Sequence, residues 1–277
     1  MRFLCFGTVY PMRTYDVNGE DFLSVTTALD VLRVPGLLEW ASGQALDSAF
    51  ADRDKIAFAS HEELKQLRAY HREQHERTRD AAAATGTAVH EAVASDGGPG
   101  APLPEDKKIA AYVKQWRLLC EEHGITTQGF EATVAHTGHR YAGTLDAYAT
   151  LKGYEGLGVL DIKTGKTATH ELYALQVAAY AHANQKLSVH GVLSDAPDVS
   201  FAFIAHVRPR SRGLHRVDIS QPVFESFLRI LSVAEDVYGG VHEGAISGRL
   251  VPGAPEALLI KEEPSQHPQE THNPFEV

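Results

Sequence analysis

The pattern of hydrophobic and polar positions is clearest in the middle of the chain. Apolar and polar residues alternate from Tyr141 to Leu151, and a short apolar, β-branched run extends from Gly158 to Thr164. Both patterns predict strands. The intervening residues 152–156 include two glycines and predict a hairpin loop. A helix is predicted to begin near Thr169, so this part of the chain reads as strand, turn, strand and helix.

The flanking patterns predict an α/β fold: a helix, a three-stranded antiparallel meander, a helix, and then further strands and a helix. Residues 1–80 are predicted to form a mainly helical cap, residues 81–252 the core, and residues 253–277 a disordered tail. The elements expected are a hairpin about Asn18-Gly19, a helix over Ala28–Arg33 capped by Thr26 or Thr27, helices over 36–50, 60–79 and around His90, a helix over Lys107–His123 stopped by Gly124, strands over 130–137, 199–207 and 214–219, and a helix over 221–237.

The central hairpin brings charged residues together. If it folds symmetrically about Gly153 and Tyr154, Asp146 lies opposite Asp161, and Lys163 shares the face of Asp161. Like charges opposed across a strand pair are destabilising, and a hard divalent cation such as Mg²⁺ would compensate them. Lys163 is then placed to hold or deprotonate an attacking water. A solvated hairpin with a surface Asp–Lys pair is the alternative.

Two helical segments add polar groups to this arrangement. Gln176 and Tyr180 are four residues apart and share one face of the helix after the hairpin. Upstream, residues 84–90 read Ala-Thr-Gly-Thr-Ala-Val-His and offer the imidazole of His90, which could equally be a hydrogen-bonded core histidine.

Four short motifs in this order resemble the RecB-like branch of the PD-(D/E)XK nuclease superfamily. They are G-T-x-x-H at 86–90, G-x-x-D at 143–146, D-x-K at 161–163 and Q-x-x-x-Y at 176–180, and the resemblance covers about 85–250. It implies a restriction-endonuclease-like αβββαβ core and one or two Mg²⁺ or Mn²⁺ ions. Some members carry an iron–sulfur cluster, but Cys5 and Cys120 are too few for one, so no cluster is expected.

The resemblance also implies roles for individual residues. Asp146, Asp161 and the backbone carbonyl of Ile162 would be metal ligands, with His90 completing a metal position. Lys163 would position and activate the water, and Gln176 and Tyr180 would hold phosphates of the strand or support the carboxylates. Glu131 matches a glutamate of phage-type members that could assist metal or water binding, or it could be a simple edge-strand charge.

The net charge of -10 means that any contact with nucleic acid must come from local basic patches. Residues 206–216 carry four arginines and no acid between two predicted strands, so we expect a projecting arginine-rich hairpin that binds DNA or is simply solvated. The candidate contacts are Arg208, Arg210, Arg212 and Lys166.

These observations favour a divalent-metal-dependent DNA nuclease, preferentially an exonuclease acting in recombination, repair or replication in a bacterial or phage setting. Alternatives are a non-catalytic DNA-binding or assembly module with a nuclease-like fold, a structure-selective endonuclease, and an RNA-directed phosphodiesterase. A recombination or single-strand-binding protein and a second copy of the chain are further candidate partners. No apolar run approaches a membrane span and no signal-peptide pattern is present, so a cytoplasmic location is expected.

Overall fold

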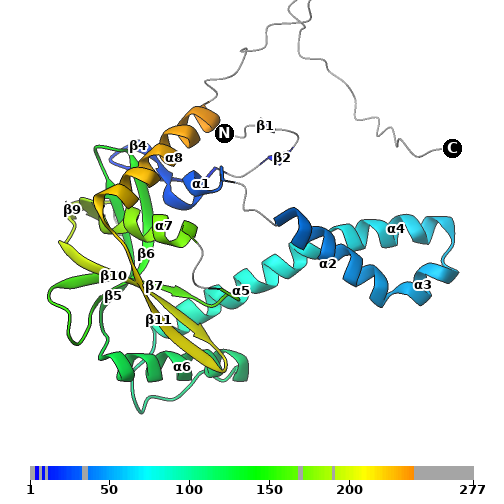
Figure 1. The fold of residues 1–277 in the computed structure, drawn as a ribbon, viewed down its shortest axis with the longest axis horizontal. Helices are drawn as coiled ribbons and strands as arrows, with labels where there is room; N and C mark the ends of the chain where they lie inside the picture. The colour runs from blue at the N-terminus through cyan, green and yellow to red at the C-terminus, as the bar shows by residue number, and fades with distance from the viewer. Residues whose placement is uncertain are drawn as a thin grey trace, which may run out of the picture.

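A nine-stranded, mainly antiparallel sheet forms the centre of the protein in the computed structural model (Figure 1). The structure describes residues 4–5, 8–9, 12–32, 37–167, 171–188 and 191–239, so the predicted tail at 253–277 lies outside the described residues. The strand order is β11-β10-β7-β6-β5-β8-β9, with β4 attached to β6 and β3 to β4. Helices lie on this sheet, which confirms the α/β class. The bounds are β1 Leu4–Cys5, β2 Thr8–Val9, β3 Thr14–Val17, β4 Glu20–Ser24, α1 Val25–Leu29, α2 Leu37–Ala51, α3 Arg53–Phe58, α4 His61–Arg72, α5 Gln74–Ala94, α6 Lys107–His123, β5 Thr126–His136, β6 Tyr141–Thr150, β7 Leu157–Lys163, α7 Glu171–Ala181, β8 Gln185–Leu187, β9 Leu193–Asp195, β10 Val199–Arg208, β11 Ser211–Val217 and α8 Gln221–Gly239.

The predicted meander is present as β5, β6 and β7, and each strand runs antiparallel to the next. β6 pairs with β7 through Ala147↔Leu160 and Ala149↔Gly158, and the same register continued by one residue sets Asp146 opposite Asp161. After α7 the chain returns in β10, which runs parallel to β7. The chain order of helix, three antiparallel strands, helix and parallel strand follows the expectation.

The first strand of the meander begins earlier than predicted, at Thr126 rather than at Phe130. Its pairing with β6 shifts register between Thr127 and Phe130. Gly129 and Glu131 both have positive φ, at 89° and 54°. Such a bulge interrupts the alternation of apolar and polar positions, which explains why the pattern located only the later part of the strand.

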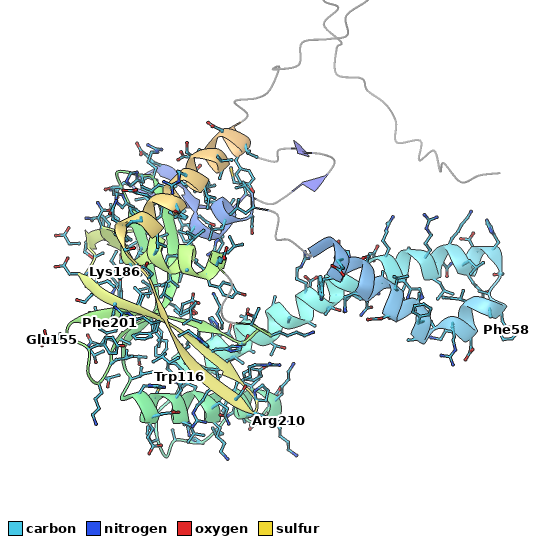
Figure 2. All side chains as sticks on the ribbon, in the orientation of Figure 1. Phe58, Trp116, Glu155, Lys186, Phe201 and Arg210 are labelled. Atoms are coloured by element: carbon cyan, nitrogen blue, oxygen red, sulfur yellow. The ribbon has the colours of Figure 1, made fainter. Side chains whose placement is uncertain are left out.

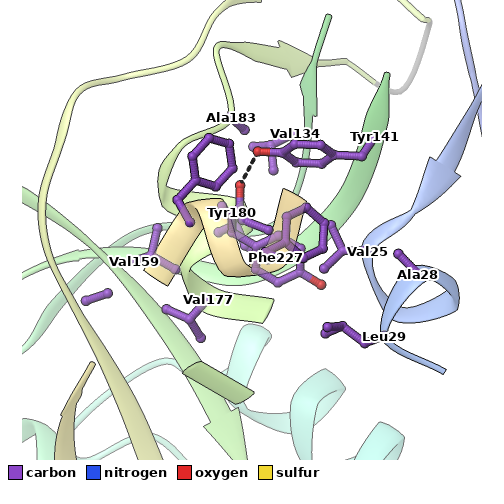
Figure 3. Packing of buried hydrophobic residues seen from close by; sticks show 14 of the residues in the cluster. Val25, Ala28, Leu29, Val134, Tyr141, Val159, Val177, Tyr180, Ala183 and Phe227 are labelled. Atoms are coloured by element: carbon purple, nitrogen blue, oxygen red, sulfur yellow. Dashed lines mark hydrogen bonds between the residues drawn. The ribbon is translucent and has the colours of Figure 1, made fainter. Parts of the chain in front are cut away.

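Buried side chains fill both faces of the sheet. On one face α7, α8 and α1 pack together around Tyr141, Tyr180 and Phe227 (Figure 3). The hydroxyl of Tyr141 donates to the carbonyl of Ala179 at 2.8 Å, which joins β6 to α7. On the other face α5 and α6 bury a second cluster that includes Leu160 and Ile162 of β7. β7 is therefore held from both sides.

The N-terminal hairpin forms as predicted, with Asn18 and Gly19 at φ 54° and 83° in its turn. It does not belong to a separate cap, because β4 pairs in parallel with β6 through Leu23↔Tyr141. The following helix, α1, was predicted too late in the sequence. Its N-cap is Ser24, whose hydroxyl accepts from the Thr27 amide at 3.0 Å, and not Thr26 or Thr27.

Helices α2, α3, α4 and the first part of α5 form an arm that extends away from the sheet, with Phe58 near its tip (Figures 1 and 2). The predicted capping box of Ser60 and Glu63 is present at the start of α4. The single helix predicted over 60–79 is wrong, because α4 ends at Arg72 and α5 continues unbroken through the predicted domain boundary at residue 80 to Ala94. The residues on both sides of the break are polar, so the hydrophobic pattern does not show where α4 ends.

Helices α6 and α8 confirm the helices predicted over 107–123 and 221–237. Asp106 caps α6 through the amides of Lys108 and Ile109, and Gly124 ends it in the left-handed conformation with φ 58°. In the described residues we find no helix with the length and apolar character required to span a bilayer.

Candidate functional site

The candidate site lies where the pairing of β6 with β7 stops. The backbone pairing ends at Ala147↔Leu160, and one residue further the Asp146 carboxylate accepts a hydrogen bond from the Ile162 amide at 2.5 Å. A side chain thus takes the place of the next backbone hydrogen bond. β5 pairs along the whole of one edge of β6, so β4 and β7 must share the other edge. The segment 143–146 lies in the notch between them.

Asp161 and Lys163 occupy the β7 side of this notch. Asp161 is only 2% exposed, and the Lys163 ammonium lies 2.8 Å from its Oδ2 and donates to its Oδ1 at 3.1 Å. Although Lys163 is close, Oδ2 accepts no hydrogen bond of acceptable geometry among the described residues. Lys163 also donates to Gln176 Oε1 at 3.3 Å and lies 4.6 Å from the centre of the Tyr173 ring.

Burial and charge act against each other at this pair. Burial raises the pKa of Asp161 to about 6, helped by the neighbouring Asp146 and opposed by Lys163. Burial lowers the pKa of Lys163, but the charge and hydrogen bond of Asp161 more than offset this and leave that pKa raised. Lys163 is therefore a cation, and the Asp161 carboxylate lacks the solvation or additional donors that would stabilise its charge.

His90 reaches the same point from α5, on the opposite side of β7 from α7. Its Nε2 lies 2.9 Å from the carbonyl oxygen of Ile162, and its Nδ1 lies 3.2 Å from Asp146 Oδ1. Burial lowers the pKa of His90, but the hydrogen bond and charge of Asp146 raise it by more. Both ring nitrogens face acceptors, an arrangement that favours the protonated imidazolium. The sequence left open whether His90 is a site residue or a hydrogen-bonded core histidine. His90 is hydrogen-bonded, and its partners are atoms of the candidate site.

Gln176 and Tyr180 are brought together as the helical spacing predicts. The Gln176 amide donates to the Tyr180 hydroxyl at 2.9 Å, while its oxygen accepts from Lys163. Tyr180 is 3% exposed and packs on β6, where a Cβ at Gly143 would lie 2.5 Å from its ring. Burial also raises the pKa of Tyr180. This placement favours the supporting role over direct contact with phosphate: Tyr180 orients Gln176, and Gln176 orients Lys163.

Glu131 lies on the other side of His90, at the bulge of β5. It contributes to a cavity of about 580 Å³ next to the candidate site, and it is exposed rather than paired with Asp146 or Asp161. The cavity is lined by Thr87, His90, Glu91, Ala94, Ser95 and Glu131.

The basic residues predicted to contact DNA divide into two groups. Arg208 and Arg210 are exposed at the tight turn of the β10–β11 hairpin, and Arg210 is at its far end in Figure 2. Arg212 instead donates to Glu122 and Gln115 of α6, each at 3.0 Å. Lys166 is exposed in the loop after β7, and this loop is tied to β10 by the contact of His206 with the Gly165 carbonyl at 2.8 Å.

Sequence reasoning missed two residues that lie next to the notch. The Tyr15 hydroxyl lies 3.1 Å from Thr144 Oγ1, between Gly143 and Asp146 on β6, and the Arg13 guanidinium lies 4.9 Å above the Tyr15 ring. Tyr15 and Thr144 are separated by 129 positions. The Asn-Gly turn predicts the hairpin that carries Tyr15, but no local pattern indicates which strand this hairpin pairs with.

The donor set has the chemistry of a site for a hard divalent cation. Two carboxylates and a carbonyl supply oxygen and His90 supplies nitrogen, and among the residues that the structure describes none donates a hydrogen bond to Asp161 Oδ2. Within the described ranges, no three side chains of His, Cys, Asp or Glu are already arranged around a common metal position. The carbonyl oxygen of Ile162, which lies 2.9 Å from His90 Nε2, is a further oxygen donor at this point.

Comparison with known proteins does not assign a family. No family model and no curated protein matches this chain. A solved structure titled "Crystal structure of SSO0001" aligns with a TM-score of 0.26 and 16% identity over 48% of this chain and 57% of that one. The chain thus spans about 57% of the length of that structure, and a similarity this weak assigns neither fold nor function.

Proposed function

We propose that this protein is a divalent-metal-dependent nuclease with a PD-(D/E)XK core that hydrolyses phosphodiester bonds in DNA, acting as an exonuclease. The observation that carries the proposal is the convergence of Asp146, Asp161 and Lys163 at the end of the β6–β7 pairing. The order of helix, three antiparallel strands, helix and parallel strand supports this type of core.

Asp146, Asp161, the Ile162 carbonyl and His90 would hold Mg²⁺ or Mn²⁺. The bound ion supplies positive charge that polarises the phosphate and neutralises the leaving oxygen. Once His90 has lost its proton, the two carboxylates outnumber the Lys163 ammonium and leave a net negative centre, which suits a divalent cation. His90 can ligate only as a neutral ring, so it would release a proton on binding the ion.

Lys163 holds the attacking water and stabilises charge on the phosphoryl oxygens. Its ammonium is fixed between the Asp161 carboxylate and the Gln176 amide oxygen. Because its pKa is raised, Lys163 acts as a hydrogen-bond donor and a positive charge, not as the base that removes the proton of the water. Gln176 limits the rotation of the Lys163 side chain, and Tyr180 limits that of Gln176.

Cleavage of end-labelled linear and circular DNA with Mg²⁺ or Mn²⁺ tests the proposal. We expect metal-dependent loss of the linear DNA, no reaction in EDTA, and a rate lower by at least about a hundredfold for Asp161→Asn and for Lys163→Ala. Lys186→Ala, which removes an exposed lysine from β8, is the matched control and should cleave like the wild type.

The outcomes separate the alternatives. Cleavage of circles would change the assignment to an endonuclease with the same residues. Cleavage by Asp161→Asn at the wild-type rate would refute the site. No cleavage of DNA, when circular dichroism shows a folded protein, would refute the proposed activity and leave a binding module or an RNA substrate.

A further inference from the structure

The N-terminal hairpin places a cation beside the notch from the side opposite β7. β4 pairs with the start of β6 at Leu23↔Tyr141, and β3 lies outside β4. From β3, the Tyr15 hydroxyl crosses to Thr144 Oγ1, which also lies 3.3 Å from Thr133 Oγ1 of β5. Three strands are therefore linked by hydroxyl groups immediately next to Asp146.

Arg13 is fixed at its backbone and stacked at its side chain. Its amide donates to Thr27 Oγ1 at 3.2 Å, and its carbonyl accepts from the Ser24 amide at 3.0 Å. Its guanidinium lies over the Tyr15 ring, at a distance typical of a cation–π contact. This geometry reduces the conformational freedom that an exposed arginine loses on binding a ligand.

The charge of Arg13 is not neutralised by an acidic side chain in the described part of the chain. Arg117, Arg140 and Arg212 are examples of the opposite case, since they pair with Asp96, Glu20 and Glu122. An exposed guanidinium that is held in place, is stacked on a ring and has no acidic partner among the described residues matches the requirements for binding a phosphate.

We propose that Arg13, held over Tyr15, binds a phosphate of the substrate strand next to the one that is cut. The assignment rests on the proposed nuclease function, because only that function makes a nucleic-acid strand the ligand of the notch. The strand would pass from Arg13 across Thr144 to the Asp146, Asp161 and Lys163 cluster. Arg13 is a binding residue and Tyr15 is a positioning residue that acts through it.

Binding of a fluorescein-labelled DNA strand in EDTA, measured by anisotropy at several salt concentrations, tests this without turnover. We expect Arg13→Ala to weaken binding about tenfold and to reduce the salt slope by about 0.7 to 0.9. Arg13→Lys should keep the slope and recover only part of the affinity, because lysine lacks the planar fork that stacks on the ring. Arg229→Ala, at an exposed arginine of α8, is the control and should change neither quantity.

The role of Tyr15 gives a second measurement on the same assay. Tyr15→Phe keeps the ring, so Arg13→Ala should still weaken binding about tenfold in that background. Tyr15→Ala removes the ring on which Arg13 stacks, so Arg13→Ala should weaken DNA binding clearly less in that background. Melting temperatures of all variants establish that they are folded.

Two results would overturn the assignment. If the wild type cleaves DNA and Arg13→Ala binds with unchanged affinity and salt slope, Arg13 has no role while the nuclease proposal stands. If the folded wild type neither binds nor cleaves DNA, both proposals fall. A wild type that binds DNA but does not cleave it removes the nuclease activity, and Arg13 is still judged by its effect on binding.

Discussion

Gly143, three positions before Asp146, has to be a glycine because the Tyr180 ring packs directly against it. A Cβ there would lie 2.5 Å from Cε1 and 3.3 Å from Cζ of Tyr180. Tyr180 is buried and hydrogen-bonded to Gln176, so its ring cannot turn away without displacing the residue that orients Lys163. The spacing of this glycine and aspartate was visible in the sequence, but its steric reason was not.

We predict that Gly143→Ala lowers the free energy of unfolding by about 1–3 kcal/mol, because it overpacks the contact between β6 and α7. Gly43→Ala is the control, since a Cβ at this position of α2 meets nothing within 4 Å and alanine favours the helix. Urea denaturation measures both. Equal stability of the Gly143→Ala variant and the wild type would show that Tyr180 does not pack as described.

Cys120 provides a pH-dependent prediction away from the site. Burial, and then the charge of Asp96, raise the pKa of this thiol to about 12. Only the thiolate attacks disulfide reagents, so the folded protein should react slowly at pH 8, and its rate should still rise about tenfold per pH unit through pH 9. Denatured protein should instead level off near pH 9.

A Cys5→Ser variant isolates the reaction of Cys120, which can be followed by the absorbance of a released thiophenolate. A folded-state rate that levels off near pH 9 would contradict the burial of this thiol. The same measurement at rising urea concentration reports when the loop at Asp96 and α6 separate.

At the scale of elements, local signals predicted most helices and turns, and the failures have physical causes. The Asn-Gly turn, the Ser60 capping box and Gly124 were all found because each satisfies backbone groups locally. The break between α4 and α5 at Glu73 was missed, although Arg77 spans it by stacking on Tyr70 and donating to its carbonyl oxygen. Such a contact leaves the hydrophobic pattern unchanged.

The arginines of the β10–β11 hairpin are expected to contribute differently to DNA binding. Charge reversal of both Arg208 and Arg210 should weaken DNA binding at least about tenfold and lower the salt slope by about 1.5, because both side chains are exposed at the turn. Arg212→Ala should change binding much less, since its guanidinium is engaged with α6. Anisotropy titrations at several salt concentrations measure both.

If Arg212→Ala and the double charge reversal lowered the affinity for DNA equally, the distinction between the exposed arginines and Arg212 would be wrong. Such a result would mean that Arg212 leaves Glu122 when DNA binds. If all the variants bind like the wild type, the hairpin is ordinary solvated surface, which was the alternative that the sequence left open.

At the scale of the whole molecule, the sequence predicted the order of the elements but not all of their partners. Alternation identifies a strand and the face it buries, but it does not say that β4 joins β6 in parallel beside β7. The notch at 143–146 exists only because of that long-range pairing. The two carboxylates and Lys163 were found because a hairpin is local. Tyr15 and Arg13 were not found, because Tyr15 is 129 positions from Thr144 in the sequence and Arg13 is farther still.

The extended arm is a second feature of the whole molecule that composition did not reveal. Helix α5 begins in the arm and ends at the site, so His90 is on the same helix as residues that pack against α2 and α4. A Cβ at Gly86 would lie 3.5 Å from the Thr164 hydroxyl, which shows how closely this helix passes the end of β7. The predicted cap and core therefore share one continuous helix.

The central claim is that Asp146, Asp161, the Ile162 carbonyl and His90 form a divalent-cation site, and titration of the metal-free protein with Mn²⁺ tests it most directly. Free Mn²⁺ is counted by electron paramagnetic resonance, with Glu20→Gln as the control for an exposed carboxylate. Saturable binding of one or two ions per chain is expected, weakened about tenfold or more by Asp161→Asn and strengthened as the pH rises through the raised pKa of His90, which must lose its proton to bind the ion. Absence of saturable binding, or equal binding by wild type and Asp161→Asn, would contradict it.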